Sequence, residues 1–457
     1  MFSVLKMSGV RLKILPEHKT GNIIRNMQGE YMTEAGNNYS EKKTQLHISV
    51  RNLVEFIFRE GDIDNRSSRA MSADAMMEGT RIHRKIQGSM GKEYQAEVPL
   101  SLVVEGDLYE LTVEGRADGI FTEDGKCFVD EIKGMYRRVE LFEKPVFVHR
   151  AQAMCYAYIF ALQNNMETIG IQMTYCNLET EQTKYFREEF SFEEIKKWFD
   201  DLMEEYGKWA TFQCEMKNQR QASIKELDFP YEYRPGQKKL VSDVYRTIMR
   251  QKLLFMQAPT GVGKTISTIF PAVKAVGEEL ADRIFYLTAK TITATVAKET
   301  FALLEKNGYR AKTIQITAKE KLCPCDEMEC NPVTCPYAKG HFDRVNDAVF
   351  DLLHRCEMIE RDDILSQADR YTVCPFELCL DTASWCDNII CDYNYVFDPN
   401  VYLKRFFQEG IKGDYIFLID EAHNMVERSR QMYSAQIYKA SIYKTSFKIA
   451  VLYIGKD

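Results

Sequence analysis

The sequence predicts an α/β protein in two domains, the second built on a parallel sheet flanked by helices. An apolar run, Leu253–Met256, has the character of a buried strand that leads into a glycine-containing loop and a helix-compatible segment. In the first half, alternating strands surround Asp124-Gly125, the strongest short hairpin signal. The 457 residues are 45% hydrophobic, which is enough for sizeable cores and excludes a disordered chain.

Composition indicates the cellular compartment of the protein and the kinds of partner it can bind. No apolar run approaches the ~20 residues of a membrane span, and the N-terminus lacks the apolar core of a signal peptide. Of the 13 cysteines, nine lie between Cys323 and Cys391. Such clustering without an export signal indicates a metal site in a reducing compartment, which we expect to be the cytoplasm. Because the net charge is −7, any surface for nucleic acid must be a local groove.

The first elements of the chain follow from local signals. A polar N-terminal extension, residues 1–45, is expected to be poorly ordered. Ser49 is a good helix N-cap, and apolar residues at helical spacing follow it. A second helix is expected over residues 76–86, where it carries His83. Strands are expected at residues 97–104, 108–121 and 127–132.

The hairpin expected at Asp124 and Gly125 brings three reactive side chains together. Positions equidistant from a two-residue turn pair across the strands, so Asp118 lies opposite Glu131. Lys133, two residues further on, shares that face. Opposed carboxylates repel each other and destabilise a sheet, but they make sense if they jointly bind a divalent cation. The pattern predicts a site for Mg²⁺ or Mn²⁺ with Lys133 beside a reacting phosphate.

This arrangement resembles the PD-(D/E)xK nuclease superfamily, and its RecB-like branch in particular. The residues that carry the resemblance are Gly115-Arg-Ala-Asp118-Gly, then Asp130-Glu131-Ile-Lys133-Gly, with Gly79-Thr-Arg-Ile-His83 upstream and a downstream Gln-x-x-x-Tyr formed by Gln152 and Tyr156. The last two residues are one helical turn apart on one face.

The resemblance implies a nuclease domain over residues 46–215, and the polar, mixed-charge composition of residues 216–228 predicts a linker after it. The resemblance also implies a role for each matched residue. A Mg²⁺ or Mn²⁺ ion would be bound by His83, Asp118 and Glu131. Catalysis would depend on Asp118, Glu131 and Lys133, and DNA contacts would come from Gln152 and Tyr156.

The glycine-containing loop after Leu253–Met256 has the composition of a phosphate-binding loop. Its residues are Ala258, Pro259, Thr260, Gly261, Val262, Gly263, Lys264 and Thr265. The glycines let backbone N–H groups turn onto phosphate oxygens. Lys264 would reach the β- and γ-phosphates of ATP, and the Thr265 hydroxyl would hold Mg²⁺.

The loop resembles that of superfamily 2 helicases, where an Ala such as Ala258 commonly replaces the usual first glycine. In that family a Gln upstream of the loop reads adenine, and Gln237 matches it. Residues 283–292 are expected to begin as a strand that ends in hydroxyls and a Lys. The family uses this motif to contact the DNA backbone, which assigns Thr288 and Lys290 to DNA.

The second half of the ATP site is Ile416-Phe-Leu-Ile-Asp420-Glu421-Ala-His423. The apolar strand delivers Asp420 to the Mg²⁺ shell, and Glu421 is placed to activate the attacking water. The family resemblance implies that His423 couples ATP binding to DNA binding.

A cysteine-rich stretch lies between the two halves of the ATP site. We expect Cys323, Cys330, Cys335 and Cys374 to hold a [4Fe–4S] cluster, although Cys325 can replace Cys323 or Cys330. The alternative is a compact Cys₄ zinc site made by residues 323, 325, 330 and 335.

An insertion of this kind, here residues 318–380, resembles the XPD/DinG family of 5′-to-3′ DNA helicases. The chain from 229 to 457 would then be the first, RecA-like motor domain, and DNA, single-stranded or 5′-tailed, the partner. Because the sequence stops 36 residues after Glu421, we expect the second motor domain to be missing. Two other interpretations stay open: a non-catalytic, DNA-binding iron–sulfur protein that uses ATP as a switch, and a zinc-containing ATPase that acts on proteins.

Overall fold

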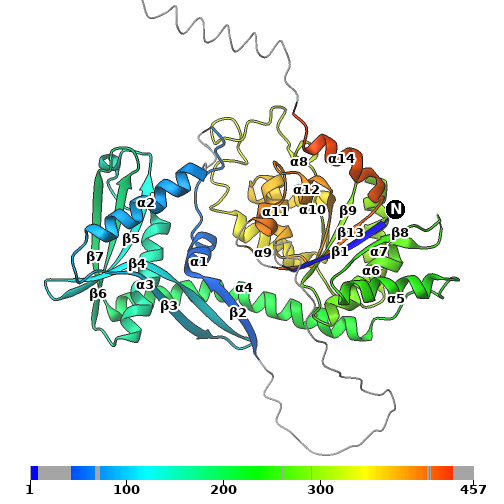
Figure 1. Ribbon diagram of the computed structural model, residues 1–457, viewed down its shortest axis with the longest axis horizontal. Helices are drawn as coiled ribbons and strands as arrows, with labels where there is room; N and C mark the ends of the chain where they lie inside the picture. Colours follow the sequence, from blue (N-terminus) through cyan, green and yellow to red (C-terminus); the bar gives the residue numbers. More distant parts are fainter. Residues whose placement is uncertain are drawn as a thin grey trace, which may run out of the picture.

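The computed structural model describes residues 2–8, 43–66, 73–259, 261–289, 291–408, 411 and 413–435. Two sheets organise them (Figure 1). One lies in the N-terminal region, residues 43–226, and the other in the C-terminal region, residues 229–435, which also receives the first strand of the chain. The predicted α/β fold class is confirmed.

The N-terminal region is a mixed six-stranded sheet in the order β2-β4-β5-β6-β7, with β3 paired to β4. The strands are β2 Thr44–Ser49, β3 Gln95–Glu105, β4 Tyr109–Glu123, β5 Lys126–Met135, β6 Thr168–Asn177 and β7 Thr183–Ser191. The helices are α1 Val50–Ile57, α2 Ala73–Ser89, α3 Phe147–Gln163 and α4 Phe192–Glu226.

Helices cover both faces of this sheet. The main core is formed by α1, α3 and the first half of α4 against the strands. On the other face, Ile82 and Ile86 of α2 pack on Ile132, Cys176 and Leu178. Burial of these apolar side chains, at about 25 cal/mol per Å², is what holds α2 on the sheet.

The C-terminal region is a seven-stranded sheet in the order β11-β10-β12-β9-β13-β1-β8. The strands are β1 Phe2–Ser8, β8 Leu253–Met256, β9 Arg283–Thr288, β10 Thr313–Gln315, β11 Met358–Ile359, β12 Asn388–Asp392 and β13 Asp414–Ile419. The run from β11 to β13 is parallel, which brings the strand ends to one edge. β1 is antiparallel to both of its neighbours.

Two hydrophobic clusters cover the two faces of this sheet. One contains α5 Gln237–Met249, α6 Lys264–Gly277 and α7 Thr291–Lys306. The other contains the helices that follow: α8 Lys319–Leu322, α9 Val345–Arg355, α10 Arg361–Tyr371, α11 Pro375–Ala383, α12 Asn394–Phe397, α13 Lys404–Phe407 and α14 Met425–Met432. The fold of this sheet and its helices brings the phosphate loop, which precedes α6, close to the residues that follow β13.

Two sequence-based expectations are wrong. Residues 1–45 were expected to lack regular structure, but residues 2–8 form β1 and β2 begins at Thr44; residues 9–42 lie outside the described residues. Residues 216–228 were expected to be a linker, yet α4 continues to Glu226. A capping box at Ser191 and Glu194 starts this helix, and its last turns are kept helical by burial of Arg220 and Ile224.

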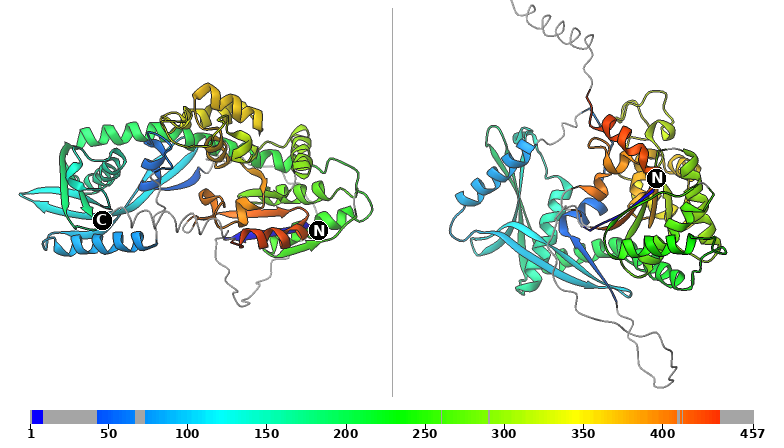
Figure 2. Two further views of the ribbon diagram at one scale, coloured as in Figure 1. Left: turned by 90° about the horizontal axis from the view of Figure 1, so that it is seen from above. Right: turned by 45° about the vertical axis from the view of Figure 1, so that its right-hand side comes forward.

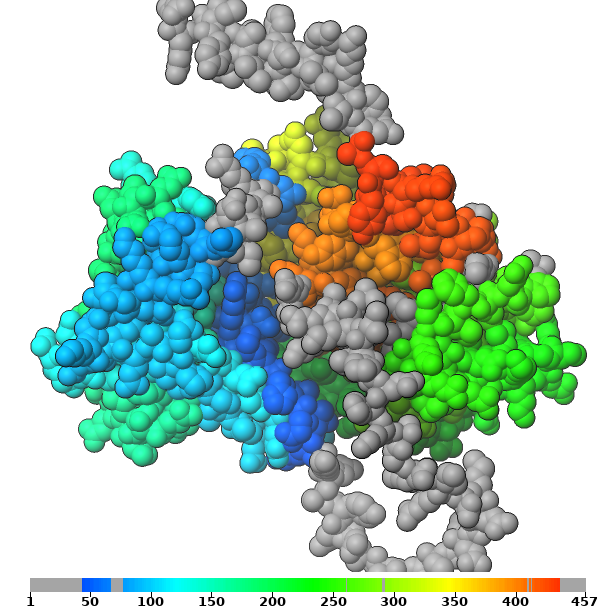
Figure 3. All heavy atoms as spheres, in the orientation of Figure 1, coloured from blue at the N-terminus to red at the C-terminus, as the bar shows by residue number. Residues whose placement is uncertain are grey.

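α4 joins the two regions, and Figures 1 and 2 show it running from one sheet towards the other. Its first half packs in the N-terminal core, Trp209 and Phe212 pack in one C-terminal cluster, and Ile224 packs in the other. On the face drawn in Figure 3, the two regions form separate masses on opposite sides.

A second connection is made by the segment between α1 and α2, residues 58–66, called here the connecting segment. Its backbone follows the cysteine-rich stretch: Ile63 N–H donates to the carbonyl of Ala338 and Asn65 N–H to that of Cys330, both at 2.9 Å. The Arg59 guanidinium donates to Asp381 Oδ2 at 2.9 Å. The two regions are therefore joined by hydrogen bonds as well as by α4.

Among the described residues, no helix is both long and apolar enough to cross a membrane.

Candidate functional site

The phosphate loop begins α6 with two glycines in left-handed conformation. Gly261 has φ +83° and Gly263 has φ +74°, values that other residues adopt only with strain. A side chain at Gly263 is excluded for a second reason, since its Cβ would lie 2.7 Å from Gln237 Nε2. Lys264 Nζ donates to the carbonyl of Ala258 at 3.4 Å, which folds the lysine back over the loop. Thr260 lies outside the described residues.

Asp420 and Glu421 face this loop from the end of β13. Asp420 is 8% exposed, and its N–H donates to the carbonyl of Leu287 in β9 at 2.9 Å. Burial raises the pKa of the Asp420 carboxyl, and a hydrogen bond with Tyr286 opposes that rise. Glu421 Oε1 lies 4.0 Å from Lys264 Nζ. The two sequence motifs, far apart in the chain, therefore meet.

Glu421 is held in an unusual conformation. Its φ is +48°, in the left-handed region that costs a non-glycine residue about 1 kcal/mol or more. Its N–H donates to Asp420 Oδ1 at 3.0 Å, and its Oε2 lies 3.2 Å from His423 Nδ1. Backbone strain of this kind concentrates at functional sites.

Gln237, predicted to read adenine, is largely engaged by the loop itself. Its Oε1 accepts from Arg234 N–H at 3.0 Å, and its Nε2 donates to the carbonyl of Val262 at 3.2 Å and to Ser267 Oγ at 3.1 Å. Both amide protons are thus used inside the protein. In this structure Gln237 stabilises the phosphate loop through its hydrogen bonds to Val262 and Ser267.

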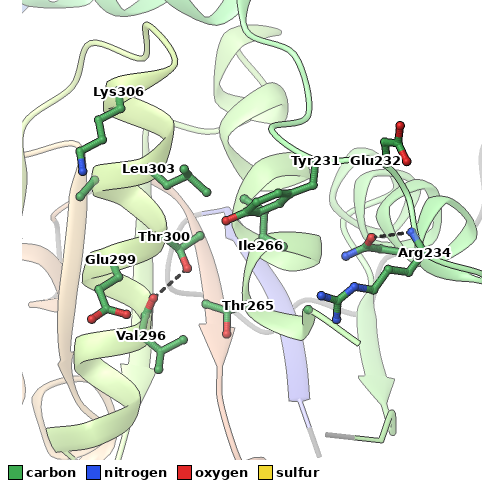
Figure 4. Close-up of a pocket in the computed structure, with 13 residues that line it drawn as sticks. Tyr231, Glu232, Arg234, Thr265, Ile266, Val296, Glu299, Thr300, Leu303 and Lys306 are labelled. Atoms are coloured by element: carbon green, nitrogen blue, oxygen red, sulfur yellow. Dashed lines mark hydrogen bonds between the residues drawn. The ribbon is translucent and has the colours of Figure 1, made fainter. Parts of the chain in front are cut away.

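A cleft of about 700 Å³ opens beside Gln237 and Thr265. Figure 4 shows Tyr231 and Arg234 on one side of it and Glu299 and Lys306 of α7 on the other. Sequence reasoning missed these four residues. The aromatic-rich run before Gln237 was the available signal for Tyr231, whereas α7 carries no motif. The volume of the cleft is large enough for a nucleotide.

The predicted DNA-contacting motif is only partly described. Thr288 is buried at the end of β9, and its hydroxyl is hydrogen-bonded to that of Thr293. Lys290 lies outside the described residues. The structure thus gives Thr288 a local bonding role and leaves the DNA assignment as a prediction.

In the cysteine-rich stretch, Cys323, Cys325 and Cys335 lie near one another. Cys325 Sγ lies 3.8 Å from Cys335 Sγ, and Cys323 Sγ lies 3.9 Å from the Cys325 carbonyl oxygen. Burial and the neighbouring Cys335 raise the pKa of Cys325 to about 12. Cys374 is held near the stretch because its N–H donates to His341 Nδ1 at 3.1 Å, and burial raises the pKa of its thiol to about 11.

These positions test the predicted metal ligands. A tetrahedral thiolate site with ~2.3 Å metal–sulfur bonds has sulfur–sulfur edges of about the length seen between Cys325 and Cys335. Within the described part of the chain, however, no three His, Cys, Asp or Glu side chains are close enough to hold a metal ion. The stretch as it stands completes neither the predicted four-cysteine cluster set nor the zinc set.

The predicted hairpin is confirmed. Asp124 and Gly125 both have positive φ, +51° and +76°, as a tight two-residue turn requires. The ladder pairs Phe121 with Phe128 and Gly119 with Asp130, which is the predicted register. Asp118 and Glu131 are the next positions in that register, where the strands leave the ladder.

Four of the predicted side chains, in two pairs, lie at this end of the hairpin. Asp118 Oδ2 accepts from Ile132 N–H at 2.7 Å, and Asp118 Oδ1 lies 3.5 Å from His83 Nδ1 of α2. Lys133 Nζ lies 2.5 Å from Glu131 Oε1. Burial is the largest influence and lowers the pKa of the His83 imidazole, but the hydrogen bond and the charge of Asp118, together with the charge of Glu131, raise that pKa above its ordinary value.

Glu131 is the most confined of these groups. It is 1% exposed, and its Oε2 is buried without a hydrogen-bond partner. Burial raises the pKa of its carboxyl to about 8, Lys133 opposes the shift, and Asp118 adds to it. An orphaned buried carboxylate oxygen is costly unless a ligand such as a cation satisfies it.

Gln152 and Tyr156, both on α3, contact residues of the hairpin strands β4 and β5. Gln152 Oε1 accepts from Lys133 Nζ at 3.4 Å. Tyr156 packs so closely on β4 that a Cβ at Gly115 would lie 2.5 Å from its hydroxyl.

Asp130 is a third carboxylate near the site, and the sequence did not predict its role, which is to hold neighbouring side chains by hydrogen bonds. It is fully buried and accepts from Thr174 Oγ1 at 2.6 Å and Tyr94 OH at 3.0 Å.

Parts of the chain are similar to known proteins. Residues 302–442 match the DEAD_2 family model. Regulator of telomere elongation helicase 1 of Rattus norvegicus is 20% identical over 248 residues, which are 44% of this chain and 19% of that protein. The XPD/RAD3 helicase subunit of general transcription and DNA repair factor IIH of Saccharomyces cerevisiae is 24% identical over 232 residues, which are 43% of this chain and 29% of that protein.

Among solved structures, an XPD helicase is similar with a TM-score of 0.27 and 18% identity, over 42% of this chain and 33% of that chain. The structure of SSO0001 has a TM-score of 0.25 and 20% identity, over 36% of this chain and 78% of that chain. This chain spans less than a third of the curated relatives named above. The family match, which lies in the C-terminal region, and the two curated relatives support similarity to XPD-like superfamily 2 helicases.

Proposed function

We propose that the chain is an XPD-type, ATP-dependent DNA helicase motor joined to a Mg²⁺- or Mn²⁺-dependent DNA nuclease. The observation that carries the first part is the meeting of Lys264 and Glu421 across 4.0 Å, beside Asp420 and a nucleotide-sized cleft. The similarity to the XPD/RAD3 and telomere elongation helicases supports it. We assign the nuclease to residues 46–215 and the motor to 229–457, with the insertion at 318–380.

In the proposed motor, phosphoryl transfer depends on position and charge. Lys264 and the N–H groups of the Gly261–Gly263 turn would bind the β- and γ-phosphates. Thr265 and Asp420 would hold Mg²⁺, which neutralises phosphate charge when bound. Glu421 would orient the attacking water from the γ-phosphate side, and its contact with His423 would fix its carboxylate.

In the proposed nuclease, Glu131 Oε2 and the Asp118–His83 pair would close on a divalent cation, because in the structure these side chains do not stand close enough together to hold one. When bound, it would polarise the scissile phosphate and the attacking water. Lys133 would stabilise the charge that develops on the phosphate, and Gln152 would hold the Lys133 ammonium in place.

Two activities of the purified full chain test this proposal. We expect ATP hydrolysis that needs Mg²⁺ and is slow, and cutting of single-stranded DNA that needs Mn²⁺ or Mg²⁺ and stops in excess EDTA. DNA binding with neither activity would contradict both parts and would favour the switch-like binding protein. Cutting that persists in EDTA would exclude the metal-dependent nuclease alone.

We further propose that Cys323, Cys330, Cys335 and Cys374, with Cys325 beside them, bind a [4Fe–4S] cluster. Protein purified without oxygen should then be brown and contain about four irons per chain. Cys335→Ser and Cys374→Ser should lower the iron content, while Cys214→Ser, a matched change of a buried thiol in α4, should not. Colourless anaerobic protein with stoichiometric zinc would contradict the cluster, and the short Cys325–Cys335 separation is compatible with that outcome.

A further inference from the structure

The loop that follows the proposed nuclease site exposes an aromatic ring and two guanidinium groups. Lys133 lies near the end of β5, and the strand stops at Met135. Tyr136 is 53% exposed, and the next two residues, Arg137 and Arg138, are exposed as well. Among the described residues, Arg137 has no carboxylate within ion-pair distance, and Arg138 approaches Glu140 only to 4.0 Å. These three side chains contribute little to the packing of the domain.

The backbone of this loop is nevertheless fixed. Asn177, buried at the end of β6, donates from Nδ2 to the carbonyls of Tyr136 at 3.4 Å and Arg137 at 3.0 Å. Asn177 Oδ1 in turn accepts from the N–H groups of Glu179 at 2.9 Å and Thr180 at 2.8 Å. A buried amide with all these bonds holds one conformation, so the loop presents its side chains from a rigid base.

The far side of the loop is held too. Val139 is buried, Lys184 Nζ donates to the carbonyl of Glu140 at 3.2 Å, and the Phe142 ring stacks on Tyr175 at 5.3 Å between centroids. Side chains carried on a fixed backbone bind a ligand with a smaller loss of conformational entropy than side chains on a mobile loop. Residues 136–138 are exposed, whereas Val139, which follows them, and Asn177, which holds their backbone, are buried.

We propose that Tyr136, Arg137 and Arg138 form a binding platform for single-stranded nucleic acid next to the nuclease site. A tyrosine ring stacks on an unpaired base, and arginine binds the phosphates on either side of it. At ~3.3 Å per residue, the Tyr136 backbone lies roughly 10 Å along the chain from Lys133, within a few nucleotides of the scissile phosphate. A duplex cannot use the ring in this way because its bases are already stacked and paired. The placement beside a scissile phosphate rests on the proposed nuclease, whereas the platform itself rests on the loop.

The test compares Tyr136→Ala with Tyr136→Phe and with Tyr185→Ala. Tyr185 is a matched control because it is 50% exposed in the same domain, and the register places Lys184, not Tyr185, on the face of Lys133. Full-length protein in EDTA is bound to a single-stranded oligonucleotide that carries 5-iodouracil, crosslinked by light, and mapped by peptide. We expect a crosslink at Tyr136 that Tyr136→Phe retains and Tyr136→Ala loses.

A second measurement is quantitative. With Mn²⁺, Tyr136→Ala should raise the KM for single-stranded DNA at least about five-fold, since stacking is worth roughly 1–3 kcal/mol per base. The double variant Arg137→Gln with Arg138→Gln should reduce the slope of log K against log salt by about 1.4, or ~0.7 per lost phosphate contact. Cleavage of a blunt duplex should not respond to Tyr136→Ala.

The outcomes separate the platform from the nuclease. A crosslink at Tyr136 without any metal-dependent cutting would support the platform and contradict the proposed nuclease. Cutting that depends on Asp118, together with no crosslink at Tyr136 and equal KM values for Tyr136→Ala and Tyr185→Ala, would overturn the platform. An effect of the two arginines that is equal for duplex and single strand, with no effect of Tyr136, would show general phosphate attraction and would likewise overturn it.

Discussion

The N-terminal and C-terminal regions each bring an Asp, a Glu and a Lys together, and they space them differently. In the hairpin, Lys133 Nζ is only 2.5 Å from Glu131, and the carboxylate is 1% exposed. At the phosphate loop, Lys264 Nζ stands 4.0 Å from Glu421, which is partly exposed. The same residue types therefore make a closed site in one region and an open one in the other. In the proposed function, the side chains of the closed site would move closer together around a small cation, and the open site would admit a phosphate group.

The largest expected effect breaks the closed site. Asp118→Asn keeps the size of the side chain and an oxygen that can accept from Ile132 N–H, but it removes the charge that binds a cation. We expect metal-dependent cutting of DNA to fall to background and ATP hydrolysis to stay unchanged. Circular dichroism should show an intact fold. Wild-type cutting by this variant would contradict the assignment of the hairpin as the metal site.

The next effect breaks the open site. Lys264→Ala removes the cation that the proposed motor would place nearest to the γ-phosphate, and loss of one such group lowers rates by about 10²–10³. We expect ATP hydrolysis to drop by that factor and nucleotide binding to weaken, with DNA cutting unchanged. A parallel loss of cutting would show that the two sites are coupled, which the separate constellations do not predict.

The smallest effect sharpens the comparison through pH. Because burial raises the pKa of Glu131 from 4.5 to about 8, the folded chain holds a proton there that the unfolded chain has lost. The free energy of unfolding of metal-free protein should therefore fall as pH rises between about 4.5 and 8, by at most ~1.4 kcal/mol per pH unit from this group. Glu131→Gln should reduce that slope in denaturant titrations. An unchanged slope would mean that the carboxylate is ionised in the folded state.

Local signals predicted much of the N-terminal site. Asp124-Gly125 fixes the turn, the turn fixes the register, and the register places Asp118 opposite Glu131. The period of the strand then places Lys133 on the same face. Each step depends on residues close in sequence, which is why the convergence of these groups could be foreseen.

Features that depend on distant partners could not be predicted in the same way. Gln237 holds the phosphate loop through Val262 and Ser267, whose positions are set by tertiary packing. The insertion of β1 between β13 and β8 joins residues 2–8 to strands hundreds of positions away. The polar composition of residues 216–226 suggested a linker because it hides which few side chains, such as Ile224, are buried.

Because α4 is one continuous helix, the chain cannot be divided between its two regions without damage to both. At ~1.5 Å per residue its 35 residues span about 52 Å, and no flexible joint divides them. A cut at residue 215 would leave Trp209 and Phe212 without the C-terminal cluster that buries them, and a start at 229 would lack Ile224 and the ion pair of Arg220 with Asp387. Neither half is self-sufficient, so recombination at this boundary would separate two activities only by damaging both cores.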